Sequence, residues 1–137
     1  MPVIYQWDNS DKTVLCYRLE GRWTWDEIYQ MLEEARALWK SVNHTVDMIV
    51  DMTGSAGFPP DNILGHFRNI TLNYHHANTG NTAVVGADDF FRMASGLFYK
   101  VYVLPRQQPR GNTLFVKDMD SARAALSDQR KNAKSGS

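Results

Sequence analysis

Val46-Asp47-Met48-Ile49-Val50-Asp51-Met52-Thr53-Gly54 is the stretch that decides the fold. The run from Val46 to Met52 is short and mostly apolar, and Gly54 follows it as a turn signal. Such a run is typical of a strand that is covered on both faces, as in a parallel sheet. Amphipathic segments lie on either side of it in the sequence, so we predict a central buried strand between two helices.

The segments before this strand predict a hairpin and a helix. Segments 3–7 and 13–19 are rich in β-branched and aromatic residues, and turn-forming residues at 8–11 separate them, which is typical of a β-hairpin. Thr24 and Glu27 match a capping box, and apolar residues at helical spacing continue towards Ser41. Cys16, in the second strand of the hairpin, is expected to be a small buried hydrophobe.

The segments after the central strand predict alternating helices and strands. Pro59 or Pro60 is expected in the first turn of a second helix, which Ile63, Phe67 and Ile70 mark. Residues 78–81 are a stop signal for this helix. The segments after them predict, in order, a strand at 82–86, a helix at 90–101, a polar loop at 105–109, a strand at 113–116 and a helix that starts at 120 or 121. Segment 131–137 has no apolar anchor and is predicted to be a disordered tail.

The predicted order is therefore β-β-α-β-α-β-α-β-α. We predict one α/β domain over residues 1–130, with a mixed sheet of about five strands and four helices, in which a hairpin is followed by parallel strands. The crossover between the second and third strands is expected to be right-handed.

The composition excludes several classes of protein. Fifteen basic and fifteen acidic residues give a formal charge of zero, so we expect no binding to nucleic acid. Low net charge also gives little repulsion between copies, which makes a homodimer a reasonable expectation. No apolar run approaches the roughly 20 residues of a membrane span, and no signal peptide is evident, so we predict a cytoplasmic protein.

Three loops are expected to converge at the carboxyl ends of the parallel strands, where such sheets bind ligands. They are segments 21–24, 53–60 and 86–89, and they offer polar groups on Thr53, Ser55 and Asp88. Capping of the following helix is the better explanation for Asp88 and its neighbour Asp89. For Ser55, a solvated loop hydroxyl is favoured over a nucleophile.

Aromatic residues make the same rim a candidate apolar binding site. Trp23 and Trp25 flank the predicted start of the first helix, so one is expected to point inward and the other outward. An outward tryptophan beside Phe58 would form an exposed apolar patch for a small apolar ligand or a protein partner. The predicted binding rim is Trp23, Trp25, Thr53, Ser55, Phe58 and Asp88.

The sequence predicts no catalytic residues, metal site or cofactor. His44, His66, His75 and His76 do not match the spacing of a zinc motif such as H-E-x-x-H. The stretch from Gly54 to Gly57 lacks the lysine and the spacing of a phosphate-binding loop, and the G-x-S-x-G elbow of serine hydrolases is absent. We therefore predict that the protein is not an enzyme.

Several short motifs resemble the SpoIIAA-like (STAS-like) family. They are Leu19-Glu20-Gly21 before Thr24-Trp25-Asp26-Glu27, then Ile49-Val50-Asp51-Met52, Thr82-Ala83-Val84-Val85-Gly86, and Phe115-Val116 before Ala122-Arg123-Ala124-Ala125-Leu126. The resemblance implies a five-stranded sheet with helices largely against one face, and noncatalytic roles in regulation or binding. It also makes Ser55 a candidate phosphorylation or switch residue, although the Asp-Ser-x-Gly context of the anti-sigma-factor antagonists is missing here.

Three hypotheses for function follow. The first is a noncatalytic STAS-like regulatory or binding module that acts through protein or small-ligand contacts at the rim. The second is a carrier of a small apolar molecule or lipid, in a pocket beneath the second and third helices. The third, less favoured, is a hydrolase that uses Ser55 or the rim aspartates with a histidine brought near by folding.

Overall fold

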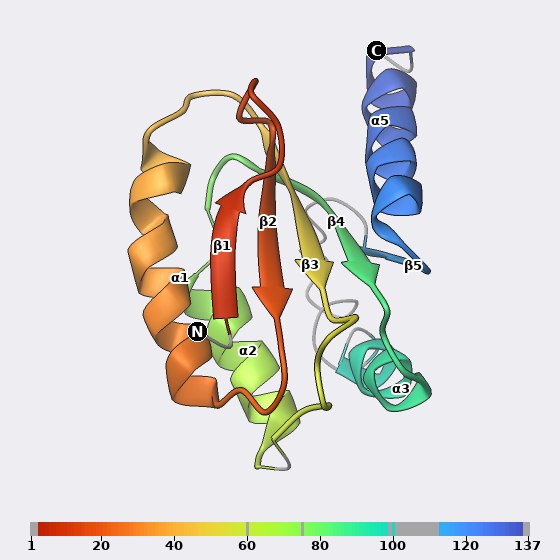
Figure 1. Ribbon diagram of the computed structural model, residues 1–137. Coiled ribbons are helices and arrows are strands. Elements are labelled where there is room, and N and C mark those ends of the chain that lie inside the picture. The colour runs from red at the N-terminus through yellow and green to blue at the C-terminus, as the bar shows by residue number, and fades with distance from the viewer. Residues whose placement is uncertain (1–2, 60, 75, 99, 101–112, 136–137) are drawn as a thin grey trace.

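A computed structural model describes residues 3–59, 61–74, 76–98, 100 and 113–135 (Figure 1). The strands are β1 (Val3–Trp7), β2 (Val14–Leu19), β3 (Val46–Asp51), β4 (Thr79–Val85) and β5 (Thr113–Val116). The helices are α1 (Trp25–Lys40), α2 (Ile63–Asn73), α3 (Asp89–Phe98) and α5 (Met119–Ser135). The polar loop predicted at 105–109, the predicted end of the third helix at Val101, and His75 lie outside the described residues.

The strands form one sheet in the order β1-β2-β3-β4-β5. β1 and β2 are antiparallel, and the other neighbouring pairs are parallel. Ile49 of the central strand lies opposite Cys16 on one side and Ala83 on the other. The predicted α/β class, the mixed sheet and the order of elements are therefore confirmed.

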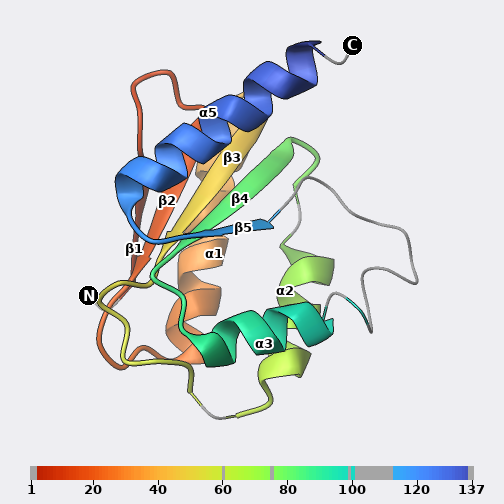
Figure 2. The same cartoon turned by 90° about the vertical axis from the view of Figure 1, so that its right-hand side faces the viewer.

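The helices lie on two faces of this sheet (Figure 2). β2 to β5 lie across the sheet in the order in which they occur in the sequence. Right-handed crossovers between strands in this order place their helices on one face of the sheet. α1 and α2 cover that face, whereas α5 returns along the opposite face and α3 lies beyond the carboxyl ends of the strands. The resemblance implied helices largely against one face, so α5 departs from that expectation.

Two apolar cores result from this layering. The core beneath α1 is built from β2 and β3 side chains such as Leu15 and Val46, together with Ile28, Ala35 and Trp39 of the helix. The core beneath α5 contains Cys16, Ile49, Ala83, Val85, Ala122 and Leu126. Cys16 is 4% exposed, so its predicted burial is confirmed.

The start of α1 is fixed by the predicted capping box. The hydroxyl of Thr24 accepts a hydrogen bond from the Glu27 amide at 3.2 Å, and the Glu27 carboxylate accepts one from the Thr24 amide at 3.0 Å. Two amides that the helix leaves unpaired are thereby satisfied. The cap fixes where α1 begins, and the buried residues that follow at helical spacing form the face that packs on the sheet.

A buried carboxylate on β3 joins the sheet to α5. Asp47 is 1% exposed, and its Oδ1 accepts a hydrogen bond from the Asn81 amide at 2.8 Å. Its Oδ2 accepts one from Arg130 Nε at 2.7 Å. Arg130 Nη2 also donates to the carbonyl oxygens of Thr13 and Thr45, at 3.0 and 2.8 Å. One side chain of α5 therefore holds the segments that lead into β2 and β3.

The same carboxylate explains why β4 begins earlier than predicted. The sequence places the strand at 82–86 after a stop signal, but β4 begins at Thr79. A Cβ at Gly80 would collide with Asp47 Oδ1, so only glycine fits beside this carboxylate. The pairing of β3 with β4 has a register irregularity between Val46 and Met48, which accommodates the extra residues.

Two other boundaries also differ from the predictions. α2 begins at Ile63 after Asn62, which adopts a left-handed conformation with φ of 49°, so neither proline lies in its first turn. α5 continues to Ser135, so residues 131–135 of the predicted disordered tail are helical. Arg130, directly before this segment, contacts the sheet through Asp47, Thr13 and Thr45, and such distant contacts cannot be predicted from the local sequence.

Replacing Arg130 by methionine is expected to destabilise the protein substantially. The Arg130→Met change leaves the Asp47 carboxylate buried without its cationic partner, and losing one member of such a pair costs about 3 kcal/mol. Urea denaturation would measure the change in the free energy of unfolding. Arg123→Met is the matched control on the same helix, because Arg123 is 50% exposed in its ion pair with Asp8 and should contribute less than about 1 kcal/mol. Equal losses in the two variants would contradict this role for Arg130.

Candidate functional site

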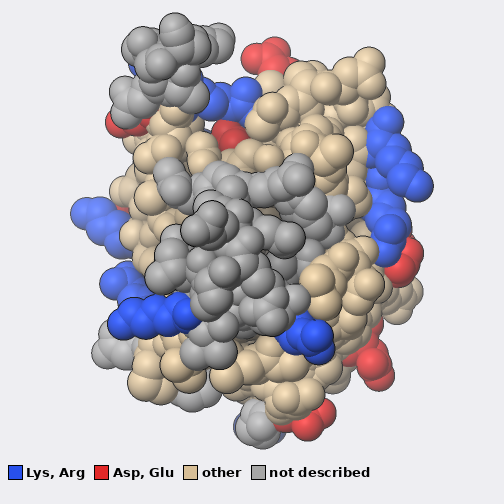
Figure 3. Space-filling model, turned by 180° about the vertical axis from the view of Figure 1, so that it is seen from behind, with Lys and Arg blue, Asp and Glu red and all other residues tan. Residues whose placement is uncertain are grey.

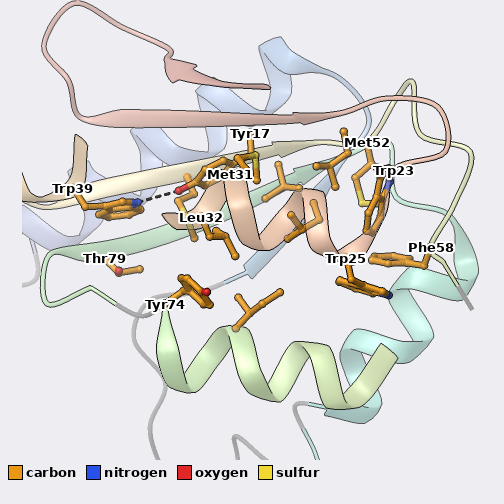
Figure 4. A pocket seen from close by; sticks show the side chains of 15 residues that line it. Tyr17, Trp23, Trp25, Met31, Leu32, Trp39, Met52, Phe58, Tyr74 and Thr79 are labelled. Carbon is orange, nitrogen blue, oxygen red and sulfur yellow. Dashed lines mark hydrogen bonds between the residues drawn. The ribbon is translucent and has the colours of Figure 1, made fainter. Parts of the chain in front are cut away.

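The candidate site is a cavity of about 310 Å³ between the sheet, α1 and α2 (Figure 4). Its lining residues come from β2, β3, β4, both helices and the loops at the carboxyl ends of the strands. They are Tyr17, Leu19, Trp23, Trp25, Ile28, Met31, Leu32, Trp39, Met48, Val50, Met52, Phe58, Ile70, Tyr74 and Thr79. None of these side chains is formally charged at neutral pH, and most are aliphatic or aromatic.

The sheet side of the cavity carries a hydrogen-bonded aromatic pair. Trp39 Nε1 donates to the Tyr17 hydroxyl at 2.9 Å, and both side chains are buried. Burial raises the pKa of Tyr17 to about 12, although the hydrogen bond from Trp39 acts in the opposite direction. The hydroxyl is therefore neutral at physiological pH, and it gives the cavity a polar contact without a charge.

The opposite end of the cavity is an aromatic cluster formed by three residues of the predicted rim. The ring centroids of Trp23 and Trp25 are 5.1 Å apart, and Phe58 lies 5.2 Å from Trp23 and 5.7 Å from Trp25. Trp23 is 3% exposed and Trp25 is 7% exposed. The prediction that one tryptophan faces outward is wrong, because Phe58 and His66 cover Trp25.

Trp25 also carries a buried donor without a protein acceptor. Its Nε1 has no hydrogen-bond partner within the described part of the chain. Figure 4 shows this nitrogen near Phe58, at the end of the cavity away from Trp39. A buried N–H that lacks a partner is unfavourable, so an acceptor atom at this end would be stabilised.

Ser55 joins the aromatic cluster through a hydrogen bond. Its Oγ accepts from Trp23 Nε1 at 2.9 Å and from the Gly57 amide at 3.1 Å. Its backbone forms a bridge with Gly21, which has a φ of 58°. The loops that follow β2 and β3 therefore meet at Ser55, as predicted from the topology. The hydroxyl is half-buried and contributes to the structure of the loop.

The other two predicted rim residues have different surroundings. The Thr53 hydroxyl donates to Asp51, a buried carboxylate whose Oδ1 also accepts from the Thr53 amide at 3.0 Å. Asp88 directly precedes α3, and its carbonyl oxygen accepts from the Arg92 amide at 3.1 Å, as an N-cap residue does. Neither residue lines the cavity, so the site contains Trp23, Trp25, Phe58 and, through its hydrogen bond, Ser55.

α2 covers the cavity and is held to α1 near both of its ends. Towards the start of α2, the Tyr29 hydroxyl lies 2.6 Å from His66 Nδ1, and the His66 ring stacks on Trp25 with centroids 4.3 Å apart. At the other end, Arg36 Nη2 donates to the Asn73 carbonyl at 3.0 Å, and its guanidinium lies 4.8 Å from the Tyr74 ring centroid. The cover is thus fixed by polar and aromatic contacts, and apolar side chains face the space beneath it.

The described histidines have neighbours that account for their positions. His66 contacts Tyr29 and Trp25, His76 stacks on Trp39 with centroids 4.6 Å apart, and His44 Nε2 lies 2.8 Å from the Lys12 carbonyl oxygen. Among the described residues, no cluster of His, Cys, Asp or Glu has the arrangement of a metal site. Trp23 and Gly57 are the hydrogen-bond partners recorded for the Ser55 hydroxyl.

Most of the lining was missed by the sequence interpretation. Met31, Leu32 and Trp39 belong to the apolar stripe of α1, and Tyr17 and Val50 belong to buried strands. Apolar spacing identifies such residues as inward-facing, but it does not distinguish a filled core from the wall of a cavity. The pocket was predicted beneath the second and third helices, whereas the cavity lies beneath α1 and α2.

No protein-family model matches this chain, and neither does any curated protein.

None of the helices in the described part of the chain combines the length and the apolar character that a membrane span requires. The fold and the cavity are therefore the basis for a functional proposal.

The buried groups predict a loss of stability at alkaline pH. Burial, and then the negative charges of Asp8 and Asp51, raise the pKa of Cys16 from 9.0 to about 11. The thiol ionises more easily in the unfolded chain, so its contribution to stability is complete below pH 9.0 and disappears as the pH rises towards about 11. In that window the loss for one such group approaches about 1.4 kcal/mol per pH unit.

Urea denaturation across this pH range would measure the effect. The Cys16→Ala variant removes the thiol and should show a shallower decline in the free energy of unfolding than the unaltered protein. The comparison uses the slope of the free energy of unfolding against pH, because the substitution also changes packing at every pH. Parallel slopes would show that the thiol does not titrate differently in the folded and unfolded states.

Proposed function

We propose that this protein is a noncatalytic binding module that holds a small, uncharged, predominantly apolar molecule between its sheet and α1 and α2. The observation that carries the proposal is the cavity of about 310 Å³, in which none of the described lining residues is charged. Small-molecule sites are commonly about 300–1,000 Å³ and mostly apolar, with a few placed polar groups. Tyr17, Trp25 and Thr79 supply such groups here.

A ligand that packs against these apolar side chains would stabilise the folded protein through its binding.

The size and lining of the cavity indicate the chemical class of the ligand. An apolar protein cavity of about 150 Å³ accommodates benzene, so about twice that volume suits a bicyclic aromatic or a medium-length aliphatic molecule. A charged ligand would lose hydration without gaining a countercharge from the lining. One acceptor atom beside Trp25 Nε1 would satisfy that donor.

Figure 3 shows the molecule from behind: uncharged side chains make up much of the described surface in this view, with Lys, Arg, Asp and Glu side chains scattered among them. The resemblance to SpoIIAA-like proteins supports the noncatalytic part of the proposal. The contacts of Ser55 with Trp23 and Gly57 favour a structural role for this residue over that of a switch.

Filling the cavity is expected to abolish binding. Val50 is half-buried in the cavity wall, and a Val50→Phe change places a ring in the space that the ligand would occupy. Titration with naphthalene, biphenyl and decanol, followed by the fluorescence of the lining tryptophans, should give saturable binding for the unaltered protein. Binding to the variant should be weaker by roughly tenfold or more.

Val14→Phe is the matched control, because Val14 is a half-buried strand residue that packs in the other core. Its affinity for the same molecules should be unchanged. The proposal is rejected if none of the three molecules saturates the protein, or if Val50→Phe binds them as the unaltered protein does. Native mass spectrometry of the purified protein would reveal a copurifying apolar molecule directly.

The predicted homodimer is a second proposal, which exposed apolar side chains support. Leu64 and Leu72 of α2 are 42% and 53% exposed, and Met93 and Leu97 of α3 are 64% and 50% exposed. α2 and α3 are in contact, so these four residues lie on adjoining helices. Sedimentation equilibrium should detect a dimer that Leu72→Lys weakens and that the control Ile4→Lys, on β1, leaves intact. A monomeric unaltered protein would exclude the dimer.

A further inference from the structure

β1 is an edge strand that leaves one side of its backbone unpaired by the sheet. It pairs with β2, and it stands at the end of the strand order. A groove of about 250 Å³ runs between β1 and α1. The groove is lined by Val3, Ile4, Tyr5, Glu27, Gln30, Met31 and Glu34. It is therefore distinct from the cavity, although Met31 belongs to both.

The hydrogen-bond pattern shows which backbone groups of β1 face outward. The Asp8 amide donates to the Val14 carbonyl at 2.8 Å, so these two residues form a hydrogen-bonded position of the antiparallel pair. Such positions alternate along an antiparallel ladder. The N–H and C=O groups of Val3, Tyr5 and Trp7 consequently point away from β2. They are the groups to which an added strand would bond.

The opposite wall of the groove is acidic. Glu27 and Glu34 lie two helical turns apart on α1, which corresponds to about 10.5 Å along the helix axis. Gln30 lies between them and is exposed. The Glu34 carboxylate accepts a hydrogen bond from the Tyr5 hydroxyl at 3.4 Å, and none of the described residues that line the groove is cationic. A segment seated in the groove would therefore meet two carboxylates without a basic residue among the lining.

We propose that the β1–α1 groove binds an extended, basic segment of a partner protein, which adds to the sheet as a strand beside β1. Backbone hydrogen bonds to the outward groups of β1 would supply affinity, as in other cases of strand addition. Side chains of a strand alternate in direction, so every second residue of the segment faces α1. Lys or Arg at two of those positions would pair with Glu27 and Glu34, and smaller apolar residues would alternate with them.

The acidic wall favours such a partner over a second copy of this chain. Two copies joined through their β1 edges would bring the Glu27 and Glu34 pairs of both molecules towards one junction. Like charges at close range oppose association, whereas Lys and Arg would neutralise the same carboxylates.

Short capped peptides provide the direct test. A peptide that alternates Lys and Val should bind, as measured by fluorescence anisotropy. Its affinity should fall as the salt concentration rises. A peptide that alternates Glu and Val, and a Lys-Val peptide that is N-methylated on alternate amides, should bind at least about tenfold more weakly. In amide NMR spectra, the Lys-Val peptide should shift the signals of Val3, Tyr5 and Trp7.

Glu34→Lys is the decisive variant. Glu34 is exposed on α1, so its replacement should preserve the fold, and reversal of its charge should weaken Lys-Val binding by about tenfold. Glu33→Lys is the control, since Glu33 is the adjacent exposed residue, does not line the groove and pairs with Arg36 at 3.0 Å. Its affinity for the peptide should remain within about twofold of the unaltered value.

Three results would overturn the proposal. One is equal binding of the Lys-Val and Glu-Val peptides. Another is binding that leaves the β1 amide signals in place. The third is a dimer in sedimentation whose formation requires the β1 edge, because this would assign the groove to a second copy. All of these readouts are independent of whether the cavity holds a ligand.

Discussion

The handedness of the crossovers is the constraint on which this architecture depends. The chain steps from β2 to β5 in one direction, so right-handed connections direct their helices to a single face of the sheet. α1 and α2 share that face and enclose the cavity with β2 and β3. The last helix is not a crossover and is free to cover the other face, where the aliphatic side chains of β3 and β4 would otherwise meet water. The face that carries the cavity and the face that α5 covers are thereby separated.

The sequence was sufficient to predict the elements whose signals are local. The Thr24–Glu27 capping box and the apolar run from Val46 to Met52 each depend on near neighbours in the chain, and both identify real elements. The early start of β4 depends on Asp47, a residue 34 positions away from Asn81, so no local pattern reveals it. α5 likewise extends to Ser135, and its residue Arg130 contacts Asp47, 83 positions away in the chain.

The candidate site shows the same division between local and distant information. Trp23, Trp25 and Phe58 lie in or beside two of the three loops that were expected to converge, and the structure brings these two loops together. Their inward packing depends on His66, which belongs to α2 and stacks on Trp25. The sequence of the loops alone does not predict this contact. Tyr17 and Trp39 were identified only as core residues. Whether an inward side chain fills a core or borders a space depends on how far α2 stands from the sheet.

The two proposed binding sites differ in their electrostatic character and share one side chain. The described residues that line the cavity are uncharged, and the groove beside β1 has acidic residues in one wall. Met31 is 5% exposed and lines both. Methionine has an unbranched, adaptable side chain, so a change in its rotamer alters both spaces together. Any coupling through it is reciprocal, because an occupant of either site must change the affinity of the other by the same factor.

The link between Asp47 and Arg130 has a consequence for the order in which the protein is made. Synthesis proceeds from the N-terminus, so Asp47 leaves the ribosome 83 residues before the arginine that neutralises it. Until then, the central strand carries a carboxylate that its own sheet neighbours do not balance, which opposes early burial of that strand. The ion pair that neutralises this buried carboxylate is therefore complete only after α5 has been made.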